Sequence, residues 1–274
     1  MSRQIKIGDS VIGGDAFPFL IAGPCVIESK EITLECAEVL KQISLDLKIN
    51  IIFKSSFDKA NRSSSSSYRG PGLKKGMQIL SEVKQKTGLP ILSDVHSVSD
   101  VAHSSEVLDV LQIPAFLSRQ TDLIKSAAEC GKIINVKKGQ FLSPSDIKNV
   151  VLKFETYGCH DVLITERGTT FGYNDLVSDM RAIVKMRETG CPIIFDASHS
   201  VQSPGSMGNK SGGDRDMIFP LARAAAAVGV DGFFIECHPS PENALSDGPS
   251  MLRLEDLYEV TKTLLAIDNI SRNL

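Results

Sequence analysis

Eight short and nearly continuous apolar runs divide this chain of 274 residues, and they constrain its fold more than any other feature. They recur at intervals of about 20 to 40 residues and cover residues 19–22, 49–53, 89–92, 107–113, 132–136, 161–165, 192–195 and 232–235. Apolar runs of this length, rich in β-branched residues, are typical of strands that are buried on both faces of a parallel sheet. The sequence therefore predicts eight buried strands.

Helical periodicity lies between these runs. One predicted helix follows the expected N-cap Ser29, and its apolar residues recur at helical spacing over residues 32–47. Another is predicted to open with Ser143 as its N-cap, Pro144 at the first helical position and Asp146 in the first turn. Strands and helices are thus expected to alternate along the chain.

Eight strand–helix units in about 250 residues predict an α/β fold, the closed (β/α)8 TIM barrel. A doubly wound sheet would have a GxGxxG turn after its first strand, and none follows residues 19–22. No linker divides the sequence, so we expect residues 1–274 to form a single barrel domain. Residues 3–13 predict a short N-terminal β-hairpin, expected to plug the end of the barrel away from the catalytic loops.

Composition narrows the possible partners. The net charge of −3 and the pI near 6.0 argue against binding to nucleic acid or to an acidic membrane surface, and they favour small molecules. The six cysteines form no CxxC pair and follow no secretory leader, so we expect reduced thiols in a cytoplasmic protein. No apolar stretch approaches the roughly 20 residues that a membrane span needs.

Four residues of metal-binding type follow predicted strands or lie near the end of the chain: Cys25, His199, Glu236 and Asp247. One thiolate, one imidazole and two carboxylates from distant segments suit a divalent transition metal in a cleft better than a local zinc finger. A lone cysteine after a strand is more often a buried apolar group, so the prediction depends on where all four residues fall in the eightfold pattern. The pattern indicates an enzyme.

Basic side chains also gather after the predicted strands. They are Lys54, Lys59 and Arg62, in a loop that also holds Asn61 and Ser63, and then Arg119, Lys137, Lys138 and Arg167. Because the carboxyl ends of barrel strands form one catalytic face, we expect these cations to share one rim and to bind a polyanionic substrate. Two long loops rich in Gly and Ser, residues 63–72 and 200–213, are placed where mobile lids occur in barrels.

Several segments closely resemble the family of 3-deoxy-D-manno-octulosonate 8-phosphate synthase, also called 2-dehydro-3-deoxyphosphooctonate aldolase. They are residues 21–29, 59–64, 93–96, 114–122, 135–139, 195–200 and 235–239. The resemblance implies a TIM-barrel enzyme that condenses phosphoenolpyruvate with D-arabinose 5-phosphate and water. The products would be 3-deoxy-D-manno-octulosonate 8-phosphate and phosphate, in the pathway to the Kdo sugar of lipopolysaccharide.

The resemblance also implies roles for individual residues. Phosphoenolpyruvate would be held at its carboxylate by Lys59, with Lys54 nearby, and at its phosphate by Lys137 and Arg167. Arabinose 5-phosphate would be received by Asn61, Arg62, Ser63 and Asp94, and Gln112 and Ala115 complete the expected substrate-binding set. Arg119 would reach the arabinose phosphate across a subunit interface. We therefore expect a homo-oligomer, a homotetramer by resemblance, although the sequence does not distinguish it from a dimer.

The family divides into metal-dependent members with Cys after Gly-Pro and metal-independent members with Asn there. Cys25 and the Leu-Ser-Asp-Gly segment at residues 245–248 resemble the metal-dependent branch. The expected catalytic residues are then Cys25, His199, Glu236, Asp247 and Lys59, with zinc, iron, manganese and cobalt all open as the metal. The metal and Asp247 are expected to position or deprotonate the attacking water, and a role of the metal in orienting the aldehyde stays open.

Two alternative functions stay open. The related synthase of the shikimate pathway makes 3-deoxy-D-arabino-heptulosonate 7-phosphate from erythrose 4-phosphate, and its aldose loop resembles Lys-Pro-Arg-Thr. This chain reads Lys59-Ala-Asn-Arg, in which Asn61 adds an amide suited to a five-carbon sugar. A non-catalytic phosphosugar-binding barrel should have lost a ligand or a phosphate-binding cation, yet every position that can be matched is filled.

Overall fold

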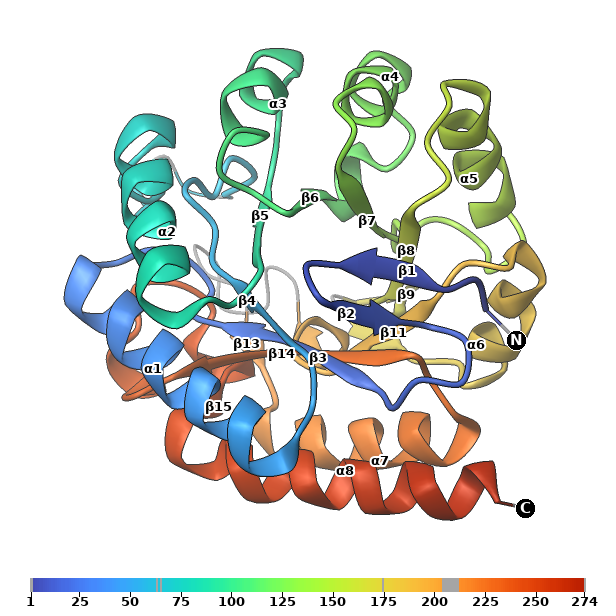
Figure 1. Cartoon of the computed structure of the whole chain (residues 1–274). Helices are drawn as coiled ribbons and strands as arrows, with labels where there is room; N and C mark the ends of the chain where they lie inside the picture. The colour runs from blue at the N-terminus through green and yellow to red at the C-terminus, as the bar shows by residue number, and fades with distance from the viewer. Residues whose placement is uncertain (1, 63, 65, 174, 204–211, 274) are drawn as a thin grey trace.

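Eight parallel strands close into a barrel in the computed structural model, which describes residues 2–62, 64, 66–173, 175–203 and 212–273 (Figure 1). The barrel strands are β3 (Phe19–Gly23), β4 (Ile51–Lys54), β5 (Ile91–Asp94), β6 (Val110–Ile113), β7 (Ile133–Lys137), β8 (Val162–Glu166), β11 (Ile193–Asp196) and β14 (Gly232–His238). Neighbours pair in chain order, and β14 pairs with both β11 and β3 to close the ring. The predicted (β/α)8 barrel is confirmed, and each predicted run overlaps one strand.

Helices surround this barrel (Figure 1). The α-helices of the described residues are α1 (Lys30–Leu47), α2 (Leu73–Thr87), α3 (Val98–Ser104), α4 (Thr121–Glu129), α5 (Ile147–Thr156), α6 (Arg181–Met186), α7 (Ile218–Val228) and α8 (Leu257–Arg272). Short 3-10 helices lie at η1 (Ala115–Leu117), η2 (Arg187–Thr189), η3 (His199–Val201), η4 (Arg215–Met217), η5 (Pro241–Asn243), η6 (Gly248–Ser250) and η7 (Leu254–Asp256).

The two predicted helix starts have different outcomes. Helix α1 begins after Ser29, whose hydroxyl accepts from the Ile32 backbone N–H, as predicted. Helix α5 begins only at Ile147, so the predicted start at Ser143 is wrong by about one turn. The Asp146 N–H donates to both the carbonyl and the hydroxyl of Ser143, which therefore caps a separate turn before the helix.

Successive residues of a strand point to opposite sides, so every second residue points into the barrel. These inward residues form two layers. The lower layer is apolar and joins inward residues of the strands to the N-terminal hairpin. It comprises Ile5, Ile7, Ile12, Phe19, Ile21, Ile52, Leu92, Val110, Ile133, Leu163, Ile194 and Phe234. Two residues further along their strands, the inward positions are polar: Lys54, Asp94, Gln112, Asn135, Thr165, Asp196 and Glu236. The apolar layer thus supports a polar layer near the carboxyl ends of the strands, which we call the polar floor.

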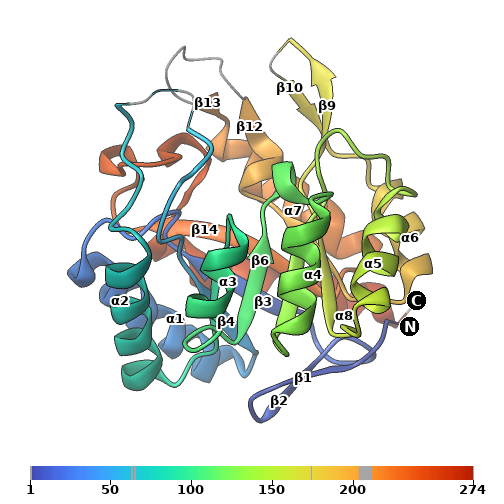
Figure 2. The same ribbon diagram turned by 90° about the horizontal axis from the view of Figure 1, so that it is seen from above.

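Short antiparallel strand pairs lie at both ends of the barrel (Figure 2). Strands β1 (Ile5–Ile7) and β2 (Ser10–Ile12) form the predicted N-terminal hairpin, on the side away from the polar floor. At the opposite end lie β9 (Thr169–Gly172) with β10 (Asp175–Val177), and β12 (Gln202–Ser203) with β13 (Gly212–Gly213). A final strand, β15 (Leu252–Arg253), pairs with the end of β14.

All six cysteines are free thiols. Among the described residues, no helix is both long and apolar enough to cross a bilayer.

Candidate active site

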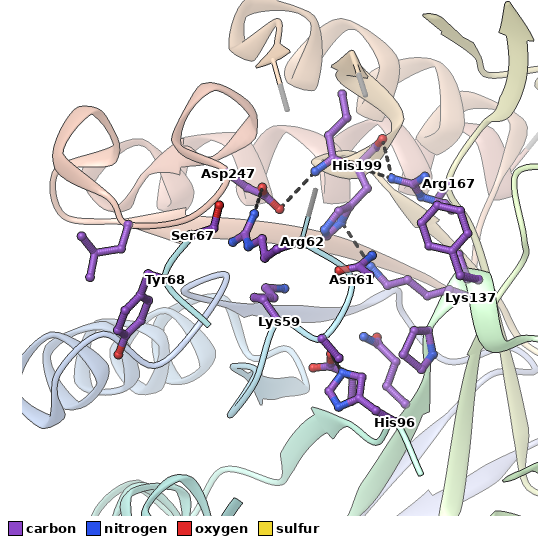
Figure 3. Close-up of a pocket in the computed structure, with 18 of the residues that line it drawn as sticks. Lys59, Asn61, Arg62, Ser67, Tyr68, His96, Lys137, Arg167, His199 and Asp247 are labelled. Carbon is purple, nitrogen blue, oxygen red and sulfur yellow. Dashed lines mark hydrogen bonds and ion pairs between the residues drawn. The ribbon is translucent and has the colours of Figure 1, made fainter. Parts of the chain in front are cut away.

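A cavity of about 940 Å³ lies above the polar floor, at the carboxyl ends of the strands (Figure 3). The predicted site residues that line it are Lys54, Lys59, Asn61, Arg62, Asp94, Gln112, Ala115, Lys137, Arg167, His199 and Asp247. These residues come from segments that are far apart in the sequence. The barrel brings them together because each follows, or ends, one of the strands.

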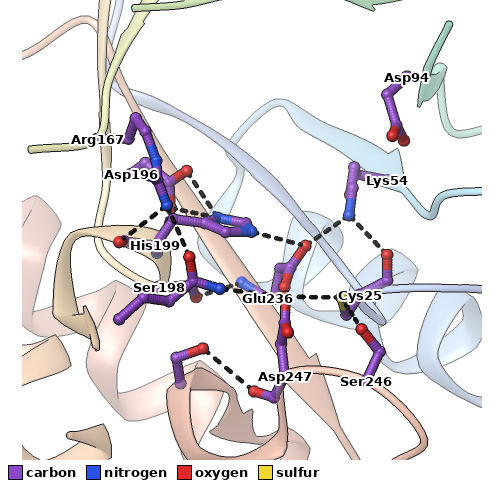
Figure 4. A network of polar contacts seen from close by, with 12 residues as sticks. Cys25, Lys54, Asp94, Arg167, Asp196, Ser198, His199, Glu236, Ser246 and Asp247 are labelled. Carbon is purple, nitrogen blue, oxygen red and sulfur yellow. Dashed lines mark hydrogen bonds and ion pairs between the residues drawn. The ribbon is translucent and has the colours of Figure 1, made fainter. Parts of the chain in front are cut away.

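Three of the four predicted metal ligands form a cluster beside this cavity (Figure 4). Ligand atoms of Cys25, Glu236 and Asp247 all lie within 4.8 Å of one another. Two ligands of one ion lie no further apart than about 4.6 Å, twice a metal–sulfur bond, so the cluster is close to the size that an ion needs. The structure therefore has a possible site for a divalent metal ion.

The donor set of this cluster fits a cation. Glu236 Oε2 is buried and has no hydrogen-bond partner among the described residues, so one carboxylate oxygen is left for a ligand. Burial raises the pKa of the Cys25 thiol far above its usual range, and Asp247 and Glu236 raise it further. Without a cation the thiol would stay protonated, whereas a bound metal ion favours the thiolate.

His199, the fourth predicted ligand, lies at the edge of the cluster. Its Nε2 is 3.6 Å from Glu236 Oε1, while its Nδ1 is 2.8 Å from Asp196 Oδ2. Asp196 also accepts from the His199 backbone N–H at 2.8 Å, so the carboxylate fixes both the loop and the ring. With Nδ1 donating to Asp196, Nε2 is the nitrogen left to face a cation.

Local backbone geometry sets the positions of Cys25 and Asp247. A Cβ on Gly23 would lie 2.1 Å from the Lys54 carbonyl oxygen, so only glycine lets β3 approach β4 this closely before the chain turns to Cys25. Asp247 has a left-handed backbone with φ of 51°, a conformation that Asp tolerates better than most residues. Its carboxylate accepts from Arg62 at 3.2 Å and from Gln202 at 3.1 Å.

Three cations face the cavity from different strand ends (Figure 3). Lys59 Nζ has no hydrogen-bond partner among the described residues, and its pKa is raised because Cys25, Glu236 and Asp94 outweigh the effect of burial. Burial lowers the pKa of Lys137 to about 8, although Asp196 and Glu236 act in the opposite direction. Arg167 donates to Gln202 at 2.7 Å and to the His199 carbonyl at 3.2 Å. Together they make a strongly cationic wall.

The part of the cavity lined by Asp94, Asn61 and Arg62 is suited to hydroxyl groups. Asp94 Oδ2 is 2.9 Å from His96 Nε2, whereas Asp94 Oδ1 is buried without a partner among the described residues. Asn61 and Arg62 also line the cavity, on the loop that carries Lys59 (Figure 3). A carboxylate oxygen, an amide and a guanidinium can together bind an alcohol chain with an anionic end.

Two predicted cations do not face this cavity. Lys138 is buried on the other side of β7, where it lies 3.6 Å from Glu166 and donates to the Leu142 carbonyl. Its neighbour Lys137 occupies the inward position, and alternation turns Lys138 outward. Arg119 is exposed and lines a separate cavity of about 230 Å³ on the outside of the barrel. The expectation that all cations share one rim is therefore wrong for these two residues, and Ser63 lies outside the described residues.

Gln202 and Ser246 belong to the site but were not among the residues predicted from the sequence. Gln202 joins Arg167 to Asp247, while the Ser246 hydroxyl contacts Cys25 Sγ at 2.9 Å and also contacts Arg62. Neither residue follows a strand of the barrel directly, so no spacing signal marked it. Asp196 was missed as well, but it follows the inward residue Ile194 by two positions, and this alternation is visible in the sequence.

The sequence of this chain matches one protein family and several related proteins over nearly its whole length. The sequence model of the DAHP synthetase I family matches residues 2–271. The 2-dehydro-3-deoxyphosphooctonate aldolase of Geotalea daltonii is 54% identical over 270 residues, which cover 98% of this chain and 99% of that protein. Proteins of the same name from Geobacter sulfurreducens (52% identical, covering 98% of this chain and 99% of that protein) and Trichlorobacter lovleyi (53%, covering 99% and 100%) are similar over the same extent.

Proposed function

This chain belongs to the DAHP synthetase I family, and we propose that it acts as a 2-dehydro-3-deoxyphosphooctonate aldolase. The enzyme condenses phosphoenolpyruvate with D-arabinose 5-phosphate and water, and it releases 3-deoxy-D-manno-octulosonate 8-phosphate and phosphate for Kdo biosynthesis. The observation that carries this assignment is one cavity in which a cationic wall lies beside a Cys, Glu and Asp cluster. The sequence identity to proteins of that name supports it independently.

Phosphoenolpyruvate suits the cationic wall because it carries a carboxylate and a phosphate. Lys59 would bind the carboxylate, with Lys54 beside it, and Lys137 and Arg167 would bind the phosphate. Lys59 supports this assignment because it is half-buried, lines the cavity and has no hydrogen-bond partner for its Nζ among the described residues. As the phosphate leaves, Lys137 and Arg167 would stabilise its growing negative charge.

Arabinose 5-phosphate would occupy the part of the cavity lined by Asp94, Asn61 and Arg62. Asp94 Oδ1, which is buried without a partner in the part of the chain that the structure describes, can accept from a sugar hydroxyl. Asn61 can donate to or accept from another. Ser63 and Ala115 are proposed to complete this region, and Arg62 is proposed to bind the sugar phosphate. The aldehyde would then face C3 of phosphoenolpyruvate across the cavity.

We propose Cys25, His199, Glu236 and Asp247 as the ligands of a divalent metal ion, with zinc, iron, manganese and cobalt as candidates. Such an ion would supply a Lewis acid at the cavity. Asp247, held by Arg62 and Gln202 at the cavity wall, is proposed to accept the proton of the water that attacks C2 of phosphoenolpyruvate. In the same region Lys54 pairs with Glu236, and Lys137 pairs with Asp196.

We also propose a single-domain cytoplasmic enzyme that forms a homotetramer. Large aromatic side chains are exposed at the carboxyl end of the barrel, among them Phe116 and Phe171, which are 55% and 77% exposed. Exposed apolar groups of this size often mark protein–protein contacts. Arg119 lies close in sequence to Phe116 and outside its own main cavity, so it is available to a neighbouring subunit.

The assay of this function supplies phosphoenolpyruvate and D-arabinose 5-phosphate and measures both phosphate and the eight-carbon product. A parallel assay with erythrose 4-phosphate distinguishes the seven-carbon synthase, and we expect a much larger kcat/KM for the five-carbon sugar. Phosphoenolpyruvate labelled at its bridging oxygen should yield labelled phosphate, because water attacks carbon. Failure to turn over either sugar would reject the proposed function.

A further inference from the structure

Three neutral polar side chains on adjacent strands form a chain of hydrogen bonds in the polar floor. The Thr165 hydroxyl donates to Asn135 Oδ1 at 2.7 Å, and Asn135 Nδ2 donates to Gln112 Oε1 at 2.9 Å. Thr165 and Asn135 are 0% exposed, and Gln112 is 4% exposed. The chain runs from β8 through β7 to β6 and ends at the cavity, which Gln112 lines.

Apolar side chains would fill these positions without the free-energy cost of burying polar groups. The inward residues one step below are Val110, Ile133 and Leu163, and they pack in the apolar layer without any polar group. A paired buried polar network fixes one arrangement of its members, and here the remaining donor, the Gln112 amide, opens onto the cavity. The network occupies positions that aliphatic residues could fill. This indicates that the orientation of its last member, Gln112, is important.

The hydrogen bonds of this network run in one direction, because Thr165 donates to Asn135 and Asn135 donates to Gln112. Because the Gln112 oxygen is occupied by Asn135, the NH2 group of Gln112 is the end that faces the cavity, and it has no hydrogen-bond partner among the described residues. A free Gln side chain could rotate and present its oxygen instead, which would repel an anion. Lys137 lines the same cavity two positions beyond Asn135 on β7, while Asp94 pairs in register with Gln112 on β5.

We propose that Asn135 and Thr165 are positioning residues that hold Gln112 as a hydrogen-bond donor to an anionic oxygen of phosphoenolpyruvate. This inference rests on the proposed function for the identity of the anion. Asn135 and Thr165 contact no substrate; they act through Gln112. Loss of either one releases the Gln112 amide, and the orientation that the anion needs is no longer enforced.

The test is a double-mutant cycle with phosphoenolpyruvate affinity as its readout, measured by isothermal titration calorimetry and so independent of turnover. Gln112→Met and Asn135→Leu should each weaken binding by about tenfold, the loss expected for one hydrogen bond to a charged group. The double variant should bind no more weakly than Gln112→Met alone, because Asn135 acts through Gln112. Additive losses would overturn the proposal, since they would mean that Asn135 supports the floor by another route.

A matched pair at Thr165 keeps the proposal testable if Asn135→Leu does not fold. Thr165→Val has nearly the same shape but removes the donor, whereas Thr165→Ser keeps the hydroxyl. We expect Thr165→Val to raise the dissociation constant and the KM for phosphoenolpyruvate severalfold, and Thr165→Ser to stay near the wild type. Equal behaviour of Thr165→Val and Thr165→Ser would overturn the role of the hydroxyl.

The proposed function and this inference fail differently. If the wild type binds phosphoenolpyruvate but condenses it with no sugar, the function is rejected while the cycle still tests the inference. If the wild type does not bind phosphoenolpyruvate, inorganic phosphate is titrated through the same set of variants. Binding of neither anion would overturn the inference.

Discussion

The ammonium nitrogen of Lys54 lies 2.5 Å from Glu236 Oε1, and the two side chains are 1% and 0% exposed. Lys54 also donates to the Cys25 carbonyl at 2.8 Å (Figure 4). One cation thus connects the strand end of β4 with the loop after β3 and with β14. Because both charges are removed from water, each depends on the other.

We predict that Lys54→Met destabilises the protein through Glu236. The variant keeps the length of the side chain but leaves a buried carboxylate unpaired, which should lower the free energy of unfolding by about 3–5 kcal/mol. Chemical denaturation in the presence of chelator measures this loss. Added divalent metal should reduce it, because Glu236 then has a different positive partner.

The matched control for Lys54→Met is Lys30→Met. Lys30 pairs with Glu82 at 2.6 Å, but these side chains are 48% and 40% exposed. Water and salt screen such a pair, so we expect no measurable change in stability. Equal denaturation curves for the two variants would contradict the structural role given to Lys54.

A pH-dependent contribution to stability is predicted at His96. Burial acts to lower the pKa of His96, but the hydrogen bond and charge of Asp94 outweigh it, so the pKa is raised above 6.5 in the folded protein. A group with a raised folded pKa stabilises the fold fully below its unfolded pKa. That stabilisation is lost as the pH rises through the folded value.

Denaturation of the wild type and of His96→Gln at several pH values tests this prediction. The wild type should exceed His96→Gln in stability at pH 5.5, and the difference should shrink by pH 8.5. Asp94→Asn removes the partner of His96 and should flatten the same dependence. A difference that grows with pH would show that the sign is wrong.

Complementation between two impaired variants tests the proposed role of Arg119. Arg119→Met should raise the KM for arabinose 5-phosphate by about tenfold or more, the effect of losing a charged contact, and leave the KM for phosphoenolpyruvate nearly unchanged. Lys137→Met should impair phosphoenolpyruvate binding. If each site takes Arg119 from a neighbour, mixed oligomers contain some sites with both native residues, and activity should rise on mixing and exchange. No gain after verified subunit exchange would place Arg119 outside the neighbour's site.

The barrel could be predicted from the sequence because its strands are buried on both faces. Such strands appear as continuous apolar runs, and the polar residues that end them mark the carboxyl end of the barrel. The β9–β10 hairpin could not be predicted, since its exposed residues, such as Phe171, have no buried face to impose a pattern. The start of α5 was misplaced because Ser143 can cap an isolated turn as well as a helix.

The candidate site could be predicted only where position on a strand determined it. Lys54 and Glu236 occupy inward positions at strand ends, and strict alternation would also have turned Lys138 outward. Gln202 could not be found this way. Its contact with Asp247 joins two loops that are 45 residues apart, and it depends on the conformation of both.

Replacement of Cys25 tests the metal site most directly. A thiolate provides charge and polarisability that a hydroxyl or methyl group does not, so Cys25→Ser and Cys25→Ala should lose tight metal binding. The loss should exceed the roughly 10–100-fold that removal of an outer partner of a metal ligand causes, and most activity should disappear with it. Metal content is measured on protein purified without added metal, and Co²⁺ gives a thiolate absorption band only if Cys25 is a ligand.

Cys25→Asn separates the metal from the remaining scaffold. The resemblance to the synthase family implies Asn at this position in the metal-independent members, which this chain does not resemble. An Asn amide there could hold the attacking water by hydrogen bonds beside Asp247. We therefore expect appreciable turnover that resists chelator in Cys25→Asn, whereas chelator should silence the wild type. Turnover is measured before and after exhaustive chelation, with metal content determined on the same samples. Full activity of a wild type shown to be free of metal would reject Cys25, His199, Glu236 and Asp247 as a catalytic metal site.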